Sequence, residues 1–261
     1  LIRSRTAAAV PAAGFDGQTR SHFESQANLE SAVGLDGSYT EGGGLGWLSE
    51  VLSAGSGDTL APFRAVAVGS VSLPMSMAGT NDALGAPSPD ALRLGALTFK
   101  GFGTGARYEV VAVDDSPTGA DMVDLWRGSA GAPPITGVSV EGAAAVLERL
   151  STAPIEVPDS SLFGMGESAP VFAAASALLA ADLGTEIVQI DMGGWDTHSA
   201  QGTLDGRFAG LLAELDAGIG ALVDRHMGSG DGLVITVMTE FGRRVKETAS
   251  GGTDHGRGGL A

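Results

Sequence analysis

The sequence contains no cysteine. This absence excludes disulfide bonds, thiolate zinc sites and cysteine nucleophiles, but it leaves the compartment open because exported proteins can also lack the residue. Long apolar runs are missing as well, since no stretch approaches the roughly 20 apolar residues of a membrane-spanning helix. The first residues, LIRSRTAAAVPAAG, lack the order of regions of a signal peptide. We therefore expect neither a membrane span nor a signal peptide within this chain.

Basic residues are few, with 15 Lys and Arg against 31 Asp and Glu, and the formal net charge is −16. A charge of this sign repels nucleic-acid backbones and anionic membrane surfaces at long range, so we expect neither as a partner. A metal ion or a local pair of arginines can still reverse the field inside one cleft. Small anionic ligands therefore stay compatible with the composition, and the sequence does not indicate an oligomeric state.

The 261 residues, of which 43% are hydrophobic, are enough for one large domain with an insertion. Short β-rich runs predict strands at 66–71 and 108–113, while residues from about 75 to 160 are broken by Gly and Pro and suggest a loop-rich insertion or lid. GFGTGA at 101–106 leads into a strand-like run instead of a helix, which excludes a dinucleotide loop. No repeat is visible, so solenoids and propellers are disfavoured.

The second half alternates between helical and strand patterns. Residues 168–184 form an Ala and Leu helical pattern that stops at Gly184, and 186–192 predict a strand. Residues 204–226 carry one apolar stripe at helical spacing, whereas 233–239 are continuously apolar and β-branched, as in a strand covered on both faces. This alternation predicts an α/β layered fold with a mostly parallel sheet.

Polar residues follow both predicted strands, where ligands collect in open α/β sheets. The candidate ligands are Asp196, His198, Glu240, Asp254 and His255. Carboxylates and neutral imidazoles suit a divalent cation, and Glu240 is a further oxygen ligand or base. Each Asp and His motif alone is typical of a turn, but two of them around one strand-helix-strand unit favour a shared metal site.

Ser21 begins a helical pattern in TRSHFESQ, three residues before Glu24, which is the spacing of a structural capping box. The same position also suits a nucleophile, because free N–H groups at a helix start attract an anionic ester. His22 is a candidate ligand or acid. Arg243 and Arg244 are candidates to clamp an oxyanion, with solvated surface as the alternative.

The motifs RSHFESQ, GGWDTHSAQ, TEFGRRVKE and GGTDHGRG together resemble an uncharacterised-domain family of bacterial proteins, often exported by the twin-arginine route. That family looks like a branch of the alkaline phosphatase and sulfatase superfamily. The resemblance implies a three-layer α/β/α core, a nucleophile near Ser21 and metal ligands among the five candidates above. It also implies export to the periplasm or outside the cell.

Two departures from the superfamily pattern accompany this resemblance. Glu240-Phe241 stands where the superfamily more often has Asp-His, which bears on a second metal site. An initial strand with a glycine-rich Asp motif and a strand after the Asp-His-Gly segment are not seen, so we expect residues 1–261 to be one domain that lacks its N- and C-terminal parts.

Two functions remain as hypotheses. The first is a hydrolase of phosphate or sulfate esters that depends on a divalent metal, with Zn, Ca, Mg and Mn all open, and that acts on a small anionic ester. The alternative is a non-catalytic secreted binding or assembly protein that keeps the fold.

Overall fold

The computed structural model describes residues 11–12, 20–31, 46–54, 64–69, 73–78, 83–86, 155–181, 183–227, 232–256 and 259–260. These residues form a mixed α/β structure. The helices are α1 (His22–Glu30), α2 (Trp47–Ala54), α6 (Ala169–Ala180) and α7 (Arg207–His226), with 3-10 turns η1 (Met75–Met77) and η2 (Ser160–Phe163). The strands are β1 (Pro11–Ala12), β2 (Ala65–Val68), β3 (Ala83–Ala86), β4 (Ile187–Ile190), β5 (Arg243–Glu247), β6 (Thr253–His255) and β7 (Gly259–Leu260).

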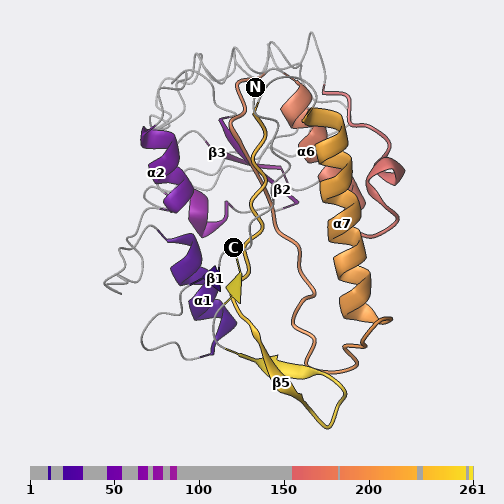
Figure 1. The fold of residues 1–261 in the computed structure, drawn as a ribbon. Coiled ribbons are helices and arrows are strands. Elements are labelled where there is room, and N and C mark those ends of the chain that lie inside the picture. The colour runs from indigo at the N-terminus through magenta and orange to yellow at the C-terminus, as the bar shows by residue number, and fades with distance from the viewer. Residues whose placement is uncertain are drawn as a thin grey trace, which may run out of the picture.

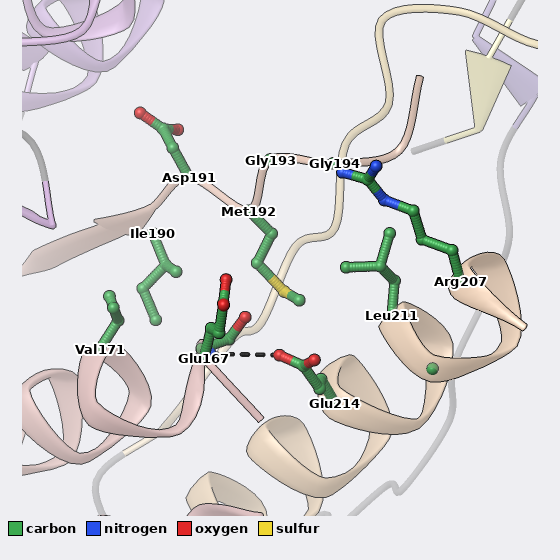
Figure 2. Close-up of a pocket in the computed structure, with 12 residues that line it drawn as sticks. Glu167, Val171, Ile190, Asp191, Met192, Gly193, Gly194, Arg207, Leu211 and Glu214 are labelled. Carbon is green, nitrogen blue, oxygen red and sulfur yellow. Dashed lines mark hydrogen bonds between the residues drawn. The ribbon is translucent and has the colours of Figure 1, made fainter. Parts of the chain in front are cut away.

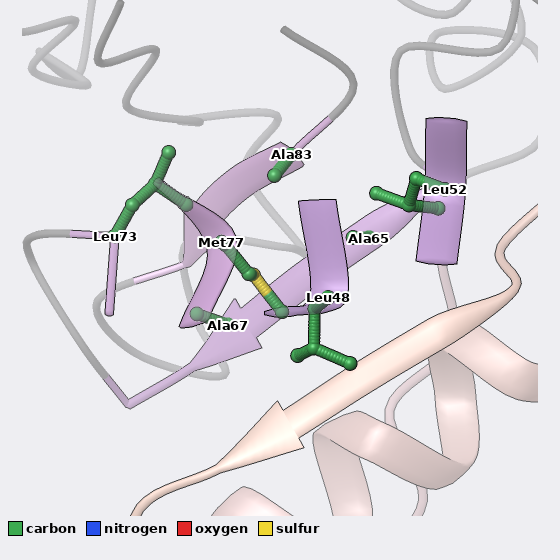
Figure 3. Packing of buried hydrophobic residues seen from close by; sticks show 7 residues of the cluster. All are labelled: Leu48, Leu52, Ala65, Ala67, Leu73, Met77 and Ala83. Carbon is green, nitrogen blue, oxygen red and sulfur yellow. The ribbon is translucent and has the colours of Figure 1, made fainter. Parts of the chain in front are cut away.

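A small parallel sheet of order β3-β2-β4 stands at the centre, with α2 on one side and α6 and α7 on the other (Figure 1). Successive side chains of β2 point to opposite faces, as the two-residue period of a strand requires. Ala65 and Ala67 pack toward α2 and η1 (Figure 3), whereas Val66 and Val68 pack against α6. The central strand is therefore buried on both faces, which explains its lack of polar residues.

An ion pair between a buried arginine and an exposed glutamate fixes the start of this sheet. Arg64 precedes β2 and is 3% exposed, and its Nε donates to Oε1 of Glu186, which precedes β4, over 2.6 Å. The same guanidinium donates to the carbonyl oxygen of Leu52 at the end of α2. Since Ala65 is in register with Ile187, this pair aligns the two parallel strands and docks α2 on them.

Most of the predicted helices and strands that fall within the described residues are confirmed, with small shifts at their ends. The 168–184 helix is α6, the 186–192 strand is β4 and the 204–226 helix is α7, while the 66–71 strand is β2. Predicted strand 108–113 lies outside the described residues, as does most of the 75–160 insertion. The start of that range contains η1 and β3, and β3 pairs with β2 in the main sheet.

The strand predicted at 233–239 is wrong for this structure. These residues have no strand assignment, and Val234 is 86% exposed. An apolar β-branched sequence becomes a strand only where a neighbour supplies ladder hydrogen bonds and both faces are covered. Neither condition holds for this run among the described residues, so the backbone leads to β5 without joining the sheet.

Candidate metal centre

Three side chains converge beyond the carboxyl end of β4. They are Asp196 and His198 in the loop after β4 and His255 in β6, and one ligand atom from each lies within 4.8 Å of the other two. Oδ1 of Asp196 is 2.6 Å from Nε2 of His255 and 2.9 Å from Nε2 of His198. We call this group the acid–imidazole triad. It could hold a divalent metal ion, and its site is partly open to solvent.

The other ring nitrogen of each histidine also has an oxygen partner. Nδ1 of His255 lies 3.1 Å from the carbonyl oxygen of Arg20, and Nδ1 of His198 lies 3.3 Å from Oδ1 of Asp254. Carbonyl and carboxylate oxygens only accept, so both nitrogens of each ring face an acceptor and each ring donates from at least one of them. If a metal ion binds between Asp196 and the two Nε2 atoms, the oxygen partners of Nδ1 can hold the ring protons. Arg20 has a left-handed φ of 69°, an uncommon conformation at the residue whose carbonyl meets the triad.

Hydrogen bonds from the β5-β6 hairpin hold the loop that carries Asp196 and His198. The carbonyl of His198 accepts from Thr248 Oγ1 at 3.1 Å and from Ser250 Oγ at 2.9 Å. Gly252 packs so closely beneath this carbonyl that a Cβ on it would lie 2.2 Å from the carbonyl carbon of His198. The two segments that supply the triad therefore form one unit although they are more than fifty residues apart in sequence.

Hydrogen bonds to the side chain of Gln201 also join the loop after β4 to the β5-β6 hairpin. Thr197 is 3% exposed, and its Oγ1 donates to Oε1 of Gln201 at 3.1 Å. Thr253 Oγ1 donates to the same amide oxygen at 2.7 Å. Neither Gln201 nor Thr197 is among the residues predicted from the sequence. Their position within GGWDTHSAQ could have identified them, because polar residues next to metal ligands often orient those ligands.

Arg243 lies behind the triad. Its guanidinium donates to the carbonyl oxygens of Trp195 and Thr253, and Nη2 is 3.5 Å from Oδ1 of Asp196. Arg243 therefore joins the loop to the hairpin and supports the carboxylate of Asp196, and its predicted role in binding an oxyanion stays a prediction. Arg244 instead faces Asp254, with 3.6 Å between Nη1 and Oδ2.

The electrostatics of this group favour an ionised Asp196. Partial burial opposes its ionisation, but the hydrogen bond from His255 and the charges of His255, His198 and Arg243 outweigh burial and lower the pKa of Asp196 below its usual value. Burial also lowers the pKa of Arg243, against the opposing effect of nearby carboxylates. Asp196 is therefore a carboxylate at neutral pH and is available as a metal ligand.

The start of α1 approaches the triad from a third direction. The ring of His22 lies 5.2 Å from that of His255, measured between centroids, and its Nδ1 is 3.7 Å from Oε1 of Glu240. The carbonyl of Ser21 accepts from the N–H of Ser25, so Ser21 occupies the N-cap position of α1. The structure thus gathers the predicted residues into one region. Only Asp196, His198 and His255 form the close cluster, with Asp254 behind His198 and Glu240 beside His22.

No helix in the described part of the chain combines the length and apolar character needed to cross a bilayer. No curated protein and no solved structure gives a significant match to the sequence. One family model does match: residues 149–261 align with a family described as a protein of unknown function, DUF1501. Asp196, His198 and His255 fall inside this alignment and Ser21 falls outside it, so the C-terminal part of the chain is similar to DUF1501 proteins over the segment that supplies the acid–imidazole triad.

Proposed function

We propose that this protein is a metal-dependent hydrolase of phosphate or sulfate esters with a three-layer, alkaline-phosphatase-like core. One observation carries the proposal. Nε2 of His198 and Nε2 of His255 both lie within 2.9 Å of one carboxylate oxygen of Asp196, and the Nδ1 atom of each ring has an oxygen partner that can hold the ring proton. When both rings are neutral and carry their protons at Nδ1, the three facing atoms are all acceptors and repel one another unless a positive charge lies among them. A bound cation satisfies all three at once.

The donor set narrows the choice of ion. Two imidazole nitrogens and one carboxylate oxygen suit Zn²⁺ or Mn²⁺, whereas Mg²⁺ and Ca²⁺ prefer oxygen ligands throughout. Three protein ligands also leave coordination positions open, as in catalytic zinc sites. The ion, when bound, supplies Lewis-acid stabilisation of an ester oxygen and lowers the pKa of a coordinated hydroxyl or water.

The protein supplies the remaining groups. Ser21 is the proposed nucleophile, because it begins α1 between Arg20 and His22, both of which meet His255. N–H groups in the first turn of a helix have no partner within the helix, and those of α1 would bind anionic ester oxygens in this proposal. His22, paired with Glu240, is positioned to donate a proton, and Arg243 holds Asp196 in place.

The test uses the whole chain, reconstituted with Zn²⁺ or Mn²⁺ and assayed with p-nitrophenyl phosphate and p-nitrophenyl sulfate. We expect about one ion per chain and turnover of at least one ester. Asp196→Asn should lose both the ion and turnover, because it removes the charge shared by the two imidazoles. Ser21→Ala should keep the ion and lose turnover by at least about a hundredfold.

Asp205→Asn is the matched control, since it neutralises an exposed carboxylate in the same loop outside the triad. It should retain both properties. Metal binding by Asp196→Asn at the affinity of the unmodified protein would refute the site. Loss of turnover in Asp205→Asn to the same degree would show that the effect is not specific to the triad.

One feature favours the non-catalytic alternative. The ion would join three chain segments, around Arg20, Asp196 and His255, and would therefore act as a structural staple. In that case chelation lowers the melting temperature and no ester is hydrolysed. Turnover that disappears on chelation while the fold persists supports the hydrolase. Export by the twin-arginine route follows from the resemblance alone and stays a prediction.

A further inference from the structure

A cavity of about 610 Å³ lies between the start of α6, the end of β4 and the first turns of α7, and its lining includes Gly194, two residues before Asp196 (Figure 2). Its apolar wall is made by Val171, Ile190, Met192 and Leu211. We call it the α6–α7 pocket. A cavity of this size and lining accommodates the carbon skeleton of a small organic molecule.

The charged groups of the pocket are unequal in number. Glu167, Asp191 and Glu214 contribute carboxylates, and Arg207 contributes the one guanidinium. Glu214 accepts from the backbone N–H of Ser168 at 3.1 Å. Within the described residues no ion pair joins any of these carboxylates or Arg207 to a partner. The pocket therefore keeps an excess of negative charge that a cationic ligand can neutralise.

These charges are also ordered along the pocket. Gly194 belongs to the wall and precedes Asp196 by two residues, so their Cα atoms are at most about 7.6 Å apart. The guanidinium of Arg207 lies over this glycine, since a Cβ there would be 3.1 Å from Nη2. Asp191 lies on the side opposite Arg207 in Figure 2, and Glu167 and Glu214 lie between them. The guanidinium therefore lies over Gly194, the pocket residue nearest in sequence to the triad, and Asp191 lies beyond the side chains of Leu211 and Met192 (Figure 2).

We propose that the α6–α7 pocket binds the alcohol part of the substrate and that this part is an apolar chain ending in an ammonium group. The assignment of the alcohol as part of an ester rests on the proposed function. Arg207 is placed for the anionic end of such an ester, the apolar wall for its carbon chain, and the carboxylates for its ammonium. An alcohol with a terminal carboxylate would meet like charge at the same place.

Binding to the whole, metal-free chain tests the pocket independently of catalysis. Calorimetric titration with aminohexanol is compared with heptanol, which replaces the ammonium by a methyl group. We expect aminohexanol to bind at least about tenfold more tightly, as one charge-assisted hydrogen bond implies. The double variant Glu167→Gln/Asp191→Asn should lose this preference.

The matched control is Glu156→Gln/Asp216→Asn, which removes two exposed carboxylates outside the pocket and should keep the preference. A general attraction by the net charge of −16 predicts equal loss in both double variants, and that result overturns the proposal. Equal binding of the two alcohols by the unmodified protein overturns it as well. Circular dichroism and melting temperature establish that each variant is folded.

A second variant and a second assay separate this proposal from the hydrolase. Arg207→Gln removes a positive charge from the pocket, so it should bind aminohexanol at least as tightly as the unmodified protein but should bind its phosphate ester more weakly. A loss of alcohol binding in this variant contradicts the assigned positions of the charges. With metal present, hydrolysis of aminohexyl phosphate is compared with that of heptyl phosphate. If the protein prefers aminohexanol but hydrolyses neither ester, the proposed hydrolase function is refuted and the proposed ammonium-binding pocket is supported. Hydrolysis of both esters at equal kcat/KM refutes the ammonium site and leaves the hydrolase.

Discussion

One carboxylate oxygen of Asp196 contacts the imidazoles of both His198 and His255. The oxygen partners at the opposite nitrogen of each ring influence what this carboxylate oxygen can bind. The carbonyl of Arg20 and the carboxylate of Asp254 each face an Nδ1, so they act on the triad through proton placement. Such partners outside the ligand set commonly raise the basicity of a ligating histidine. The metal centre therefore depends on the position of backbone groups, such as the carbonyl of Arg20, as well as on the identity of its ligands.

Gly252→Ala tests that dependence. Its Cβ would lie 2.2 Å from the His198 carbonyl carbon, so the hairpin must move away from the loop. We expect a loss of about 1–3 kcal/mol in the free energy of unfolding and weaker Zn²⁺ binding. Urea denaturation and calorimetry measure the two effects. Gly232→Ala is the control because a Cβ there meets nothing within 4 Å, and equal behaviour of both variants would contradict this packing.

His226 provides a pH-dependent prediction. Its Nε2 lies 2.8 Å from Oγ of Ser176, and burial, with a smaller effect of Arg225, lowers the pKa of His226 below 6.5. The unfolded chain then binds the proton first as pH falls. The contribution of the neutral ring is complete above about pH 6.5 and is lost as pH falls through 6.5 toward the folded pKa.

His226→Gln keeps a polar partner for Ser176 but cannot take up a proton in this range. In metal-free protein, the decrease in unfolding free energy between about pH 8 and pH 5 should be smaller for His226→Gln than for the unmodified protein. Urea titrations at a series of pH values measure the difference. An identical pH profile for the two proteins would show that His226 does not contribute.

At the scale of elements, the helices and strands with strong periodicity were predictable. The apolar pattern of α6 and α7 and the β-branched runs of β2 and β4 are local properties, and the structure contains all four close to their predicted ends. The strand predicted at 233–239 is wrong because a strand also needs partners outside its own sequence. Ladder hydrogen bonds and coverage come from neighbours that the local sequence does not specify.

The contact between α6 and α7 depends on one small residue. A Cβ at Gly218 would lie 2.4 Å from the ring of Phe172, whereas a Cβ at Gly220 would meet nothing within 4 Å. Gly218→Ala should therefore lower the unfolding free energy by about 1–3 kcal/mol. Gly220→Ala should raise it by about 0.5–1 kcal/mol through helix propensity. Urea denaturation of both variants measures this contrast, and a gain of stability in Gly218→Ala would contradict the observed packing.

At the scale of the whole molecule, negative charge and an exposed apolar run coexist. The net charge of −16 favours solubility, but Val234 and Val237 are 86% and 41% exposed in a segment of high β propensity. Exposed β-branched runs promote association between chains because they offer unpaired backbone groups and apolar surface. This segment is the described region where the structure departs furthest from the sequence pattern.

Val234→Lys distinguishes the observed conformation from the predicted buried strand. Because the side chain is exposed, the variant should change the unfolding free energy by no more than about 0.5 kcal/mol and should reduce association measured by light scattering. Val66→Lys, at a position with 0% exposure in β2, should cost about 3 kcal/mol or more. Severe destabilisation by Val234→Lys would restore the strand prediction.

The sequence by itself determined the periodic elements, the absence of cysteine chemistry and the residue types of the metal centre, because these follow from local pattern and composition. The tertiary structure decided which candidates meet. Asp196, His198 and His255 became the close cluster, while Asp254 and Glu240 took neighbouring positions. Hydrogen bonds such as those from Thr248 and Ser250 set that outcome. Contacts across fifty or more residues of chain depend on the packing of whole elements, and the spacing of residues along a sequence does not specify it.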